Sequence, residues 1–149
     1  MDSLDIRENV MLPLFVNKSA DKEGEEKARE LMKRFGIDGL EKKMPYELSG
    51  GERQRAAICR ALINVTQVVF ADEPTGNLDS KSGKIVIDSL LRINEEFGKT
   101  VVMVTHDPRM ASYCDRLILL KDGVILNELR RDGEKESFYQ KILARMADL

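Results

Sequence analysis

The chain is poor in the residues that build disulfides and metal centres. Its 149 residues include two cysteines, Cys59 and Cys114, one histidine and no tryptophan. Two cysteines make no disulfide framework, so we interpret both as reduced thiols, as is usual in a cytoplasmic protein. A structural zinc site takes about four nitrogen or sulfur ligands, which makes such a site unexpected here.

The sequence also lacks long apolar runs and an excess of one charge. Its longest apolar stretches are far shorter than the roughly 20 residues that cross a bilayer. Acidic residues at positions 2, 5 and 8 stand where a secretory signal would be basic. The net charge of −2 favours neither nucleic acid nor an anionic membrane. Hydrophobic and charged contents of 42% and 34% are typical of a soluble globular protein, and the length predicts one domain.

Helical and strand patterns alternate along the chain, which indicates an α/β layered fold. Apolar runs rich in β-branched residues predict buried strands at 67–71 and 100–105. Asp122-Gly123 predicts a hairpin between 116–120 and 124–129. The expected helices are residues 19–35, 49–64, 80–97 and 135–147, the last with Tyr139, Ile142, Leu143 and Met146 on its core face.

Shorter segments connect these elements. We expect a short apolar segment at 5–12 that Pro13 stops, because proline removes a helical hydrogen bond. Residues 37–48 are expected to form a connector, and residues 107–113 one or two helical turns.

The first segment with chemical potential is Ser49-Gly50-Gly51-Glu52, at the start of the expected second helix. Ser and Glu three residues apart form a capping box, which is a structural role. A helix N-terminus also carries free N–H groups and a positive dipole end, which suit a phosphate. Two glycines at this point favour close approach to the backbone. The two interpretations are compatible, and both stay open on these residues alone.

Asp72 and Glu73 follow an apolar strand directly. This places them at the carboxyl edge of a sheet, where α/β proteins bind ligands. Successive strand residues point in opposite directions, so one carboxylate could face Mg²⁺ and the other a water nucleophile, as phosphoryl transfer requires. The alternative is a polar strand end before a proline turn.

Two further residues occupy comparable positions. His106 follows the second expected strand, where a neutral imidazole could hydrogen-bond a γ-phosphate or orient water, although a loop histidine is the simpler interpretation. Asp79 is suited to cap the helix that starts at residue 80. Gly83-Lys84 ends like a phosphate-binding loop, but the spacing is wrong and Ile85 replaces the required hydroxyl, so we expect Lys84 to be a surface residue.

Three motifs in this order and spacing resemble the ATP-binding cassette (ABC) ATPases of transporters: LSGGERQR (48–55), VVFADEPTGNLD (68–79) and VMVTHD (102–107). The resemblance covers nearly the whole chain, and its tail is similar to bacterial peptide-antibiotic (bacitracin-type), lipoprotein and macrolide exporter ATPases. It implies a partial P-loop NTPase core of the α/β class with parallel strands. Residues 1–64 would form mainly the helical signature subdomain, and residues 65–149 the C-terminal part of the nucleotide-binding core.

The resemblance also implies roles for the motif residues. Ser49, Gly50, Gly51 and Glu52 would contact ATP held by a second ATPase subunit in a head-to-tail dimer. Asp72 would hold Mg²⁺ through water, Glu73 would be the general base, His106 the switch histidine and Asp79 the D-loop aspartate. The implied partners are that second subunit and a transmembrane permease, with no nucleic acid. The implied location is the cytoplasmic face of the plasma membrane, reached through the permease.

One departure from the family is large. The aromatic loop that stacks on adenine, Walker A and the Q-loop glutamine would all precede Met1, and no Gly-x-x-x-x-Gly-Lys-Ser/Thr occurs in this sequence. We therefore expect weak Mg-ATP binding and little hydrolysis by this chain alone. In the family the Walker A strand lies between the strand before His106 and the strand at 116–120, so a gap in the sheet is expected.

Three hypotheses remain open at this point. The chain is the C-terminal part of a transporter ATPase, truncated or one half of a split subunit. Alternatively, it is a non-catalytic module that donates its signature in trans or binds a permease. The third is the C-terminal lobe of a chromosome-maintenance or DNA-repair ABC ATPase, against which stand the missing heptads of residues 1–48 and the missing basic patch.

Overall fold

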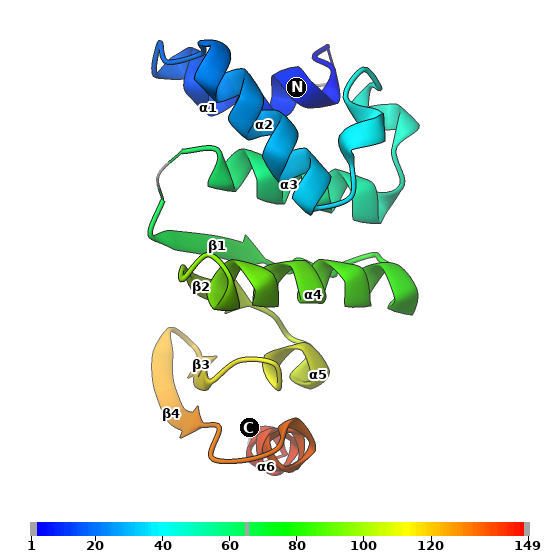
Figure 1. Cartoon of the computed structure of the whole chain (residues 1–149). Coiled ribbons are helices and arrows are strands. Elements are labelled where there is room, and N and C mark those ends of the chain that lie inside the picture. Colours follow the sequence, from blue (N-terminus) through cyan, green and yellow to red (C-terminus); the bar gives the residue numbers. More distant parts are fainter. Residues whose placement is uncertain (1–2, 65, 148–149) are drawn as a thin grey trace. The chain divides into compact units, whose positions relative to one another are not determined.

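The computed structural model describes residues 3–64 and 66–147 (Figure 1). Contacts along the chain form two compact units, Met1–Val102 and Met103–Leu149, where the length predicts one domain. The expected division between residues 64 and 65 concerns family subdomains and stays a prediction. Of the described helices, none is long and apolar enough to cross a membrane.

The first unit begins with a bundle of three helices, α1 (Ile6–Val16), α2 (Lys22–Arg34) and α3 (Gly50–Leu62), which pack against one another. Short 3₁₀ turns at Asp38–Leu40 and Pro45–Glu47 form the expected connector. The bundle has a buried apolar core, whereas Phe15 and Val16 near the end of α1 are 49% and 75% exposed. The fully enclosed side chains include Val10, Ala28, Met32, Cys59 and Ile63.

Pro13 does not stop the first helix, so the prediction of a short segment ending there is wrong. α1 continues to Val16, one turn beyond the proline. Proline removes one hydrogen-bond donor, but its fixed φ is compatible with the helix, so the following turn still forms. The Asn17 N–H donates to the Pro13 carbonyl at 3.1 Å, and Lys18 then leaves the helix with a φ of 55°.

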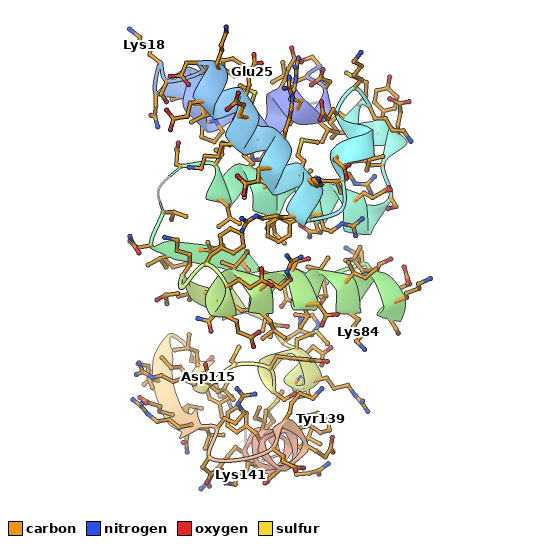
Figure 2. The ribbon with its side chains drawn as sticks, in the orientation of Figure 1. Lys18, Glu25, Lys84, Asp115, Tyr139 and Lys141 are labelled. Atoms are coloured by element: carbon orange, nitrogen blue, oxygen red, sulfur yellow. The ribbon has the colours of Figure 1, made fainter. Side chains whose placement is uncertain are left out.

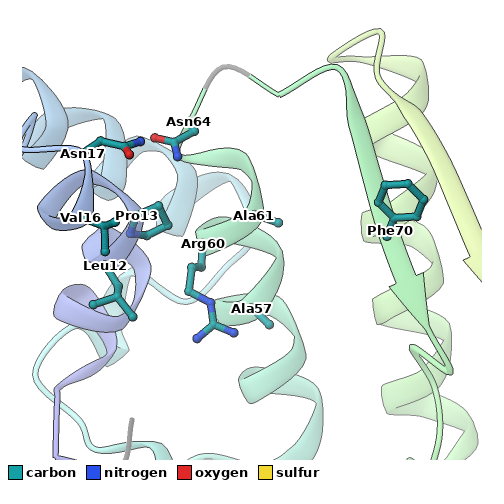
Figure 3. Close-up of a pocket in the computed structure, with 9 residues that line it drawn as sticks. All are labelled: Leu12, Pro13, Val16, Asn17, Ala57, Arg60, Ala61, Asn64 and Phe70. Carbon is teal, nitrogen blue, oxygen red and sulfur yellow. The ribbon is translucent and has the colours of Figure 1, made fainter.

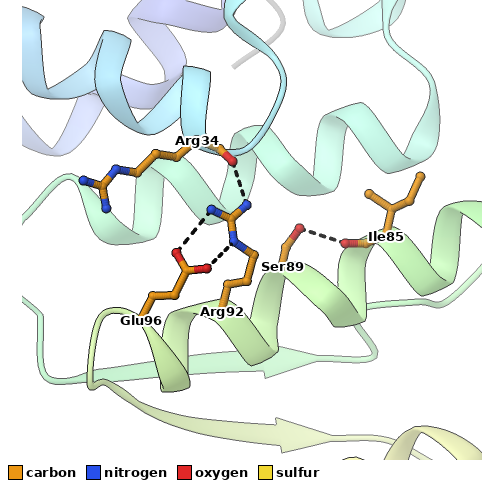
Figure 4. A network of polar contacts seen from close by, with 5 residues as sticks. All are labelled: Arg34, Ile85, Ser89, Arg92 and Glu96. Atoms are coloured by element: carbon orange, nitrogen blue, oxygen red, sulfur yellow. Dashed lines mark hydrogen bonds and ion pairs between the residues drawn. The ribbon is translucent and has the colours of Figure 1, made fainter.

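The remaining elements of this unit are β1 (Val68–Asp72), α4 (Ser80–Glu95) and the first three residues of β2 (Thr100–Val104), the strand in which the division between the units falls. β1 and β2 are neighbours in a two-stranded sheet, and their arrows point the same way, with α4 as the crossover between them (Figures 3 and 4). The Thr100 N–H donates to the Gln67 carbonyl at 3.0 Å and fixes the start of this pairing. The βαβ order matches the fold class expected from the sequence.

The expectation that both strands are buried is wrong. In β1, Val69 is 5% exposed, whereas Val68 and Phe70 are 40% and 79% exposed. Val102 and Val104 of β2 are likewise exposed. Parallel strands become buried only when helices cover both faces of the sheet, and the described residues supply one layer, α4. Sequence composition cannot reveal how many layers a strand receives.

The second unit contains α5 (Pro108–Ala111), the antiparallel strands β3 (Arg116–Lys121) and β4 (Val124–Arg130), and α6 (Lys135–Met146). The predicted Asp122-Gly123 turn is present, with φ values of 52° and 77° that connect the two strands. β3 pairs only with β4 among the described strands.

The buried face of α6 differs in part from the predicted one, because Phe138 and not Tyr139 enters the core. Phe138 and Ile142 of α6 are each 1% exposed and pack with Ala111, Leu117 and Leu129. Tyr139, predicted on the core face, is only half-buried, and the Arg109 guanidinium lies over its ring at 5.3 Å. Leu143 and Met146 are half-buried as well.

Candidate functional site

The start of α3 has the predicted capping box. The Ser49 Oγ accepts a hydrogen bond from the Glu52 N–H at 3.3 Å, and Glu52 Oε2 accepts one from the Ser49 N–H at 2.8 Å. The Ser49 hydroxyl also donates to the same carboxylate at 2.7 Å, and this side-chain bond lowers the pKa of Glu52. The reciprocal bonds hold the first turn of α3 in a defined geometry.

The two glycines allow close approach to other residues of this chain. A Cβ added at Gly50 would stand 2.6 Å from Leu78 Cδ2, and one at Gly51 would stand 3.4 Å from Ser82 Cβ. The first turn of α3 therefore lies against the start of α4, so the structure brings 49–52 and the Asp79 segment together. The N–H groups at this helix start have no acceptor four residues earlier and stay suited to an anion.

Arg55, one turn into α3, is a candidate that the sequence interpretation missed. Its Nη1 would be 3.7 Å from a Cβ at Gly51, and its Nε is buried with no hydrogen-bond partner in the described part of the chain. Arg55 also lies close enough to Cys59 to lower its pKa, although burial dominates and raises it to about 12. The spacing of four residues from Gly51 was the available signal.

Asp72 and Glu73 occupy the end of β1, as predicted. Asp72 is the last strand residue and is exposed, whereas Glu73 is half-buried. Glu73 has a φ of 42°, an uncommon conformation for a residue with a side chain, and its carbonyl accepts from the Gly76 N–H at 2.9 Å in a tight turn. The turn begins at Glu73, directly after Asp72 ends the strand.

Asp79 is the N-cap of α4, the structural role that its position predicts. Its carboxylate accepts hydrogen bonds from the N–H groups of Lys81 and Ser82, both at 3.0 Å. The bonds with Ser82 lower the pKa of Asp79.

His106 belongs to the second unit. It is exposed, directly after β2, and Asp107 beside it caps α5 through the Arg109 N–H at 2.7 Å. The Asp107 N–H in turn donates to Thr105 Oγ1 at 3.1 Å. The histidine is therefore held on a short, capped connection.

Neither Gly-Lys pair of the chain forms a phosphate loop. Gly83 lies inside α4, and Lys84 is an exposed helix residue, as expected. Gly98-Lys99-Thr100 leads from a helix into a strand, the reverse of the strand-to-helix order of a P-loop. A phosphate cradle is thus absent from the described residues.

Asp72 and Glu73 could supply only some of the ligands that a magnesium ion needs. No three His, Cys, Asp or Glu side chains gather to hold a metal anywhere in residues 3–64 and 66–147. Mg²⁺ takes six oxygen ligands and is often held by one or two carboxylates together with water and substrate phosphates. Asp72 and Glu73 therefore fit an ion that arrives with a nucleotide.

An open groove of about 710 Å³ lies between α1, α3 and β1 (Figure 3). Its apolar lining is unusually exposed, since Val16 is 75% and Phe70 79% accessible. Arg60 and two asparagines supply its polar groups. The lining residues are Leu12, Pro13, Val16, Asn17, Ala57, Arg60, Ala61, Asn64 and Phe70.

Comparisons with known proteins identify the family. The ABC transporter family pattern matches residues 1–76. The chain is 48% identical over 143 residues to the ABC transporter ATP-binding protein YxdL of Bacillus subtilis, covering 96% of this chain and 56% of YxdL. It is 43% identical over 144 residues to the bacitracin export ATP-binding protein BceA of Halalkalibacterium halodurans, covering 96% of this chain and 57% of BceA. The chain thus spans little more than half the length of these relatives.

A solved structure shows the same architecture. The dimeric bacterial ABC transporter cassette MJ0796 superposes with a TM-score of 0.75 at 40% identity, over 90% of this chain and 60% of that one. The motifs, the fold and these relatives agree, and the resemblance to bacitracin-type exporter ATPases is confirmed. The chain belongs to the ABC transporter family, within its ATP-binding cassettes.

Proposed function

We propose that this chain supplies the signature and Walker B parts of a bacterial ABC exporter ATPase. In this proposal Ser49, Gly50, Gly51 and Glu52 complete an ATP site whose phosphate loop belongs to a second subunit. The observation that carries the proposal is the first turn of α3, where the capping box holds N–H groups and the positive helix end in place. An anionic phosphate is the ligand that such a helix start suits best.

The carboxylates at the end of β1 have a different task. Asp72 would hold Mg²⁺ through water, and Glu73 would take a proton from the attacking water as general base. Magnesium, when bound with ATP, would neutralise the charge that develops on the phosphates. The uncommon backbone conformation of Glu73 supports this assignment, because such residues are concentrated at active sites. His106 would orient the water, and Asp79 would contact the partner subunit.

The proposed partners are a second cassette in a head-to-tail dimer and a transmembrane permease. The dimeric assembly of MJ0796 supports the first. The groove between α1, α3 and β1 supports the second, because its exposed apolar lining suits an apolar helix of the permease (Figure 3). The chain would then act at the cytoplasmic face of the membrane through the permease.

The proposal is tested by rescue in trans. The partner is a complete bacitracin-type cassette that keeps its phosphate loop and Walker B glutamate but has a disabled signature. Adding this chain should restore Mg-ATP hydrolysis, because the chain supplies the missing signature. The Ser49→Arg variant should fail to rescue, since its bulky cation breaks the capping box and occupies the anion position.

The matched control is Glu73→Gln in this chain. It should rescue as well as the wild type, because the general base of the restored site belongs to the partner. Loss of rescue by Glu73→Gln with retention by Ser49→Arg would reverse the assignment of the two segments. Absence of rescue by any form, while a complex is seen by size-exclusion chromatography, would contradict the proposal.

A further inference from the structure

The Ser49 side chain makes two hydrogen bonds to one residue, Glu52. The Ser49 hydroxyl donates to Glu52 Oε2 at 2.7 Å, and its oxygen accepts from the Glu52 N–H at 3.3 Å. An ionised carboxylate only accepts hydrogen bonds, so the serine must be the donor of the shorter bond. Because a hydroxyl carries a single proton, Ser49 in this arrangement has none left for a phosphate oxygen.

The contact occupies two of the donors that a phosphate at this helix start would use. One is the Ser49 hydroxyl. The other is the Glu52 N–H, the third N–H of α3, which has no acceptor four residues earlier in the helix. Gly50 and Gly51 supply the two N–H groups before it. A phosphate therefore meets an incomplete set of donors for as long as Ser49 and Glu52 stay bonded.

Several interactions keep Glu52 in this position. Its Oε2 also accepts from the Ser49 N–H at 2.8 Å. The bonds with Ser49, together with the charges of Arg55 and Lys43, lower the pKa of the Glu52 carboxyl, so the group is ionised at neutral pH. A hydrogen bond to an ionised acceptor is about twice as strong as a neutral one. The carboxylate is thus a favoured partner of the hydroxyl while no other anion is near.

We propose that Glu52 competes with phosphate for the hydroxyl of Ser49, so that the capping box is a resting state which the ATP of the partner subunit must open. The inference rests on the proposed function of residues 49–52 and makes Glu52 a positioning residue, whose carboxylate acts on Ser49 and not on the phosphate. Rotation of the Ser49 side chain about its Cα–Cβ bond frees the hydroxyl proton and the Glu52 N–H together. An arriving phosphate has to displace the carboxylate, which lowers its affinity.

This competition and a purely structural capping box predict opposite effects of Glu52→Gln. Glutamine keeps the size of the side chain and the bond to the Ser49 N–H, but as a neutral acceptor it holds the hydroxyl more weakly. If Glu52 only supported the helix start, the substitution would loosen that start and weaken anion binding. If Glu52 competes for the hydroxyl, the substitution lowers stability and yet strengthens anion binding.

The test is a titration of the isotope-labelled chain with inorganic phosphate, followed by NMR at the amide signals of Gly50 and Gly51. Glu52→Gln should bind phosphate about fivefold more tightly than the parent, the factor that separates a charged from a neutral hydrogen bond. In a Ser49→Ala background the same substitution should lose this gain, because no hydroxyl is left to release. The amide of Lys18, an exposed cation after α1 (Figure 2), reports unspecific anion binding and should respond equally in all forms.

Glu47→Gln is the matched control for the change in charge. It removes the same charge from the preceding turn, where the carboxylate accepts from the Met44 N–H at 2.7 Å, and should alter phosphate affinity by less than about twofold because an exposed charge is screened. Equal or weaker binding by Glu52→Gln, a gain that persists with Ser49→Ala, or no phosphate-dependent shift in any form would overturn the proposal. The titration contains no partner cassette, so failed rescue in trans with the expected titration contradicts the proposed function alone, and the reverse result contradicts this inference alone.

Discussion

The Gly83-Lys84 pair resembles the end of a phosphate-binding loop, whereas the structure places Gly83 inside α4. The two interpretations predict opposite effects of replacing Gly83 with alanine. In a phosphate loop, the glycine before lysine cannot be replaced without loss of backbone freedom. In the structure Gly83 is the fourth residue of α4, and a Cβ there would meet only Thr75 carbons, at 3.7 Å, an ordinary contact distance. Gly83→Ala should therefore stabilise the protein.

The magnitude follows from two contributions. Alanine is favoured over glycine within a helix by about 1 kcal/mol. The added methyl group, at a buried position beside Thr75, contributes at most about 0.8 kcal/mol. We expect an increase of about 1 to 1.5 kcal/mol in the free energy of unfolding, measured by urea denaturation with far-UV circular dichroism, since the chain has no tryptophan.

Gly50→Ala is the matched control, because it makes the same glycine-to-alanine change but places the new methyl group against a different neighbour in the folded protein. Its Cβ would stand 2.6 Å from Leu78 Cδ2, and displacing that side chain from its rotamer costs about 0.5 to 1.5 kcal/mol. The gain in helix propensity is then cancelled, so stability should stay near the parent value. A destabilised Gly83→Ala, or equal effects of the two substitutions, would refute the reasoning.

Three further predictions concern thiol reactivity, helix capping and pH. Cys59 is fully buried and has a pKa of about 12, so it should react with Ellman's reagent only after unfolding. The Cys114→Ser substitution should therefore abolish labelling of the native protein. Labelling of Cys59 in the native protein would contradict its burial. Ser49→Ala should cost about 1 kcal/mol in urea denaturation, as loss of an N-cap does. Ser49 lowers the pKa of Glu52 in the folded state, so the ionised carboxylate stabilises the fold. The free energy of unfolding of the parent should therefore exceed that of Glu52→Gln at neutral pH, and the difference should shrink as the pH falls below 4.5. A difference that grows in acid would contradict this direction of the pKa change.

The sequence predicted the elements whose causes are local. The capping residues, the helix-ending glycines and the Asp122-Gly123 turn act within a few residues, so α2, α3, α4, the hairpin and α6 were expected close to where they occur. The candidate residues at the ends of β1 and β2 were found because parallel strands present their carboxyl ends to ligands.

The features that were missed depend on contacts between distant segments. Exposure of Phe70 depends on which layers cover the sheet, and composition carries no information on that. A glycine is needed at position 50 because Leu78, 28 positions later, leaves little room for a side chain. The rings of Phe35 and Phe97 stack because the ends of two helices meet. None of these pairs has a signature within a short window of sequence.

Phosphate release from Mg-ATP by this chain alone tests most directly whether the chain depends on the phosphate loop of a partner. Asp72 and Glu73 provide negative charge at the end of β1, and the described residues provide no phosphate cradle beside them. We expect release at the background rate, equal in the parent and in Glu73→Gln. Hydrolysis clearly above background that Glu73→Gln abolishes would contradict it.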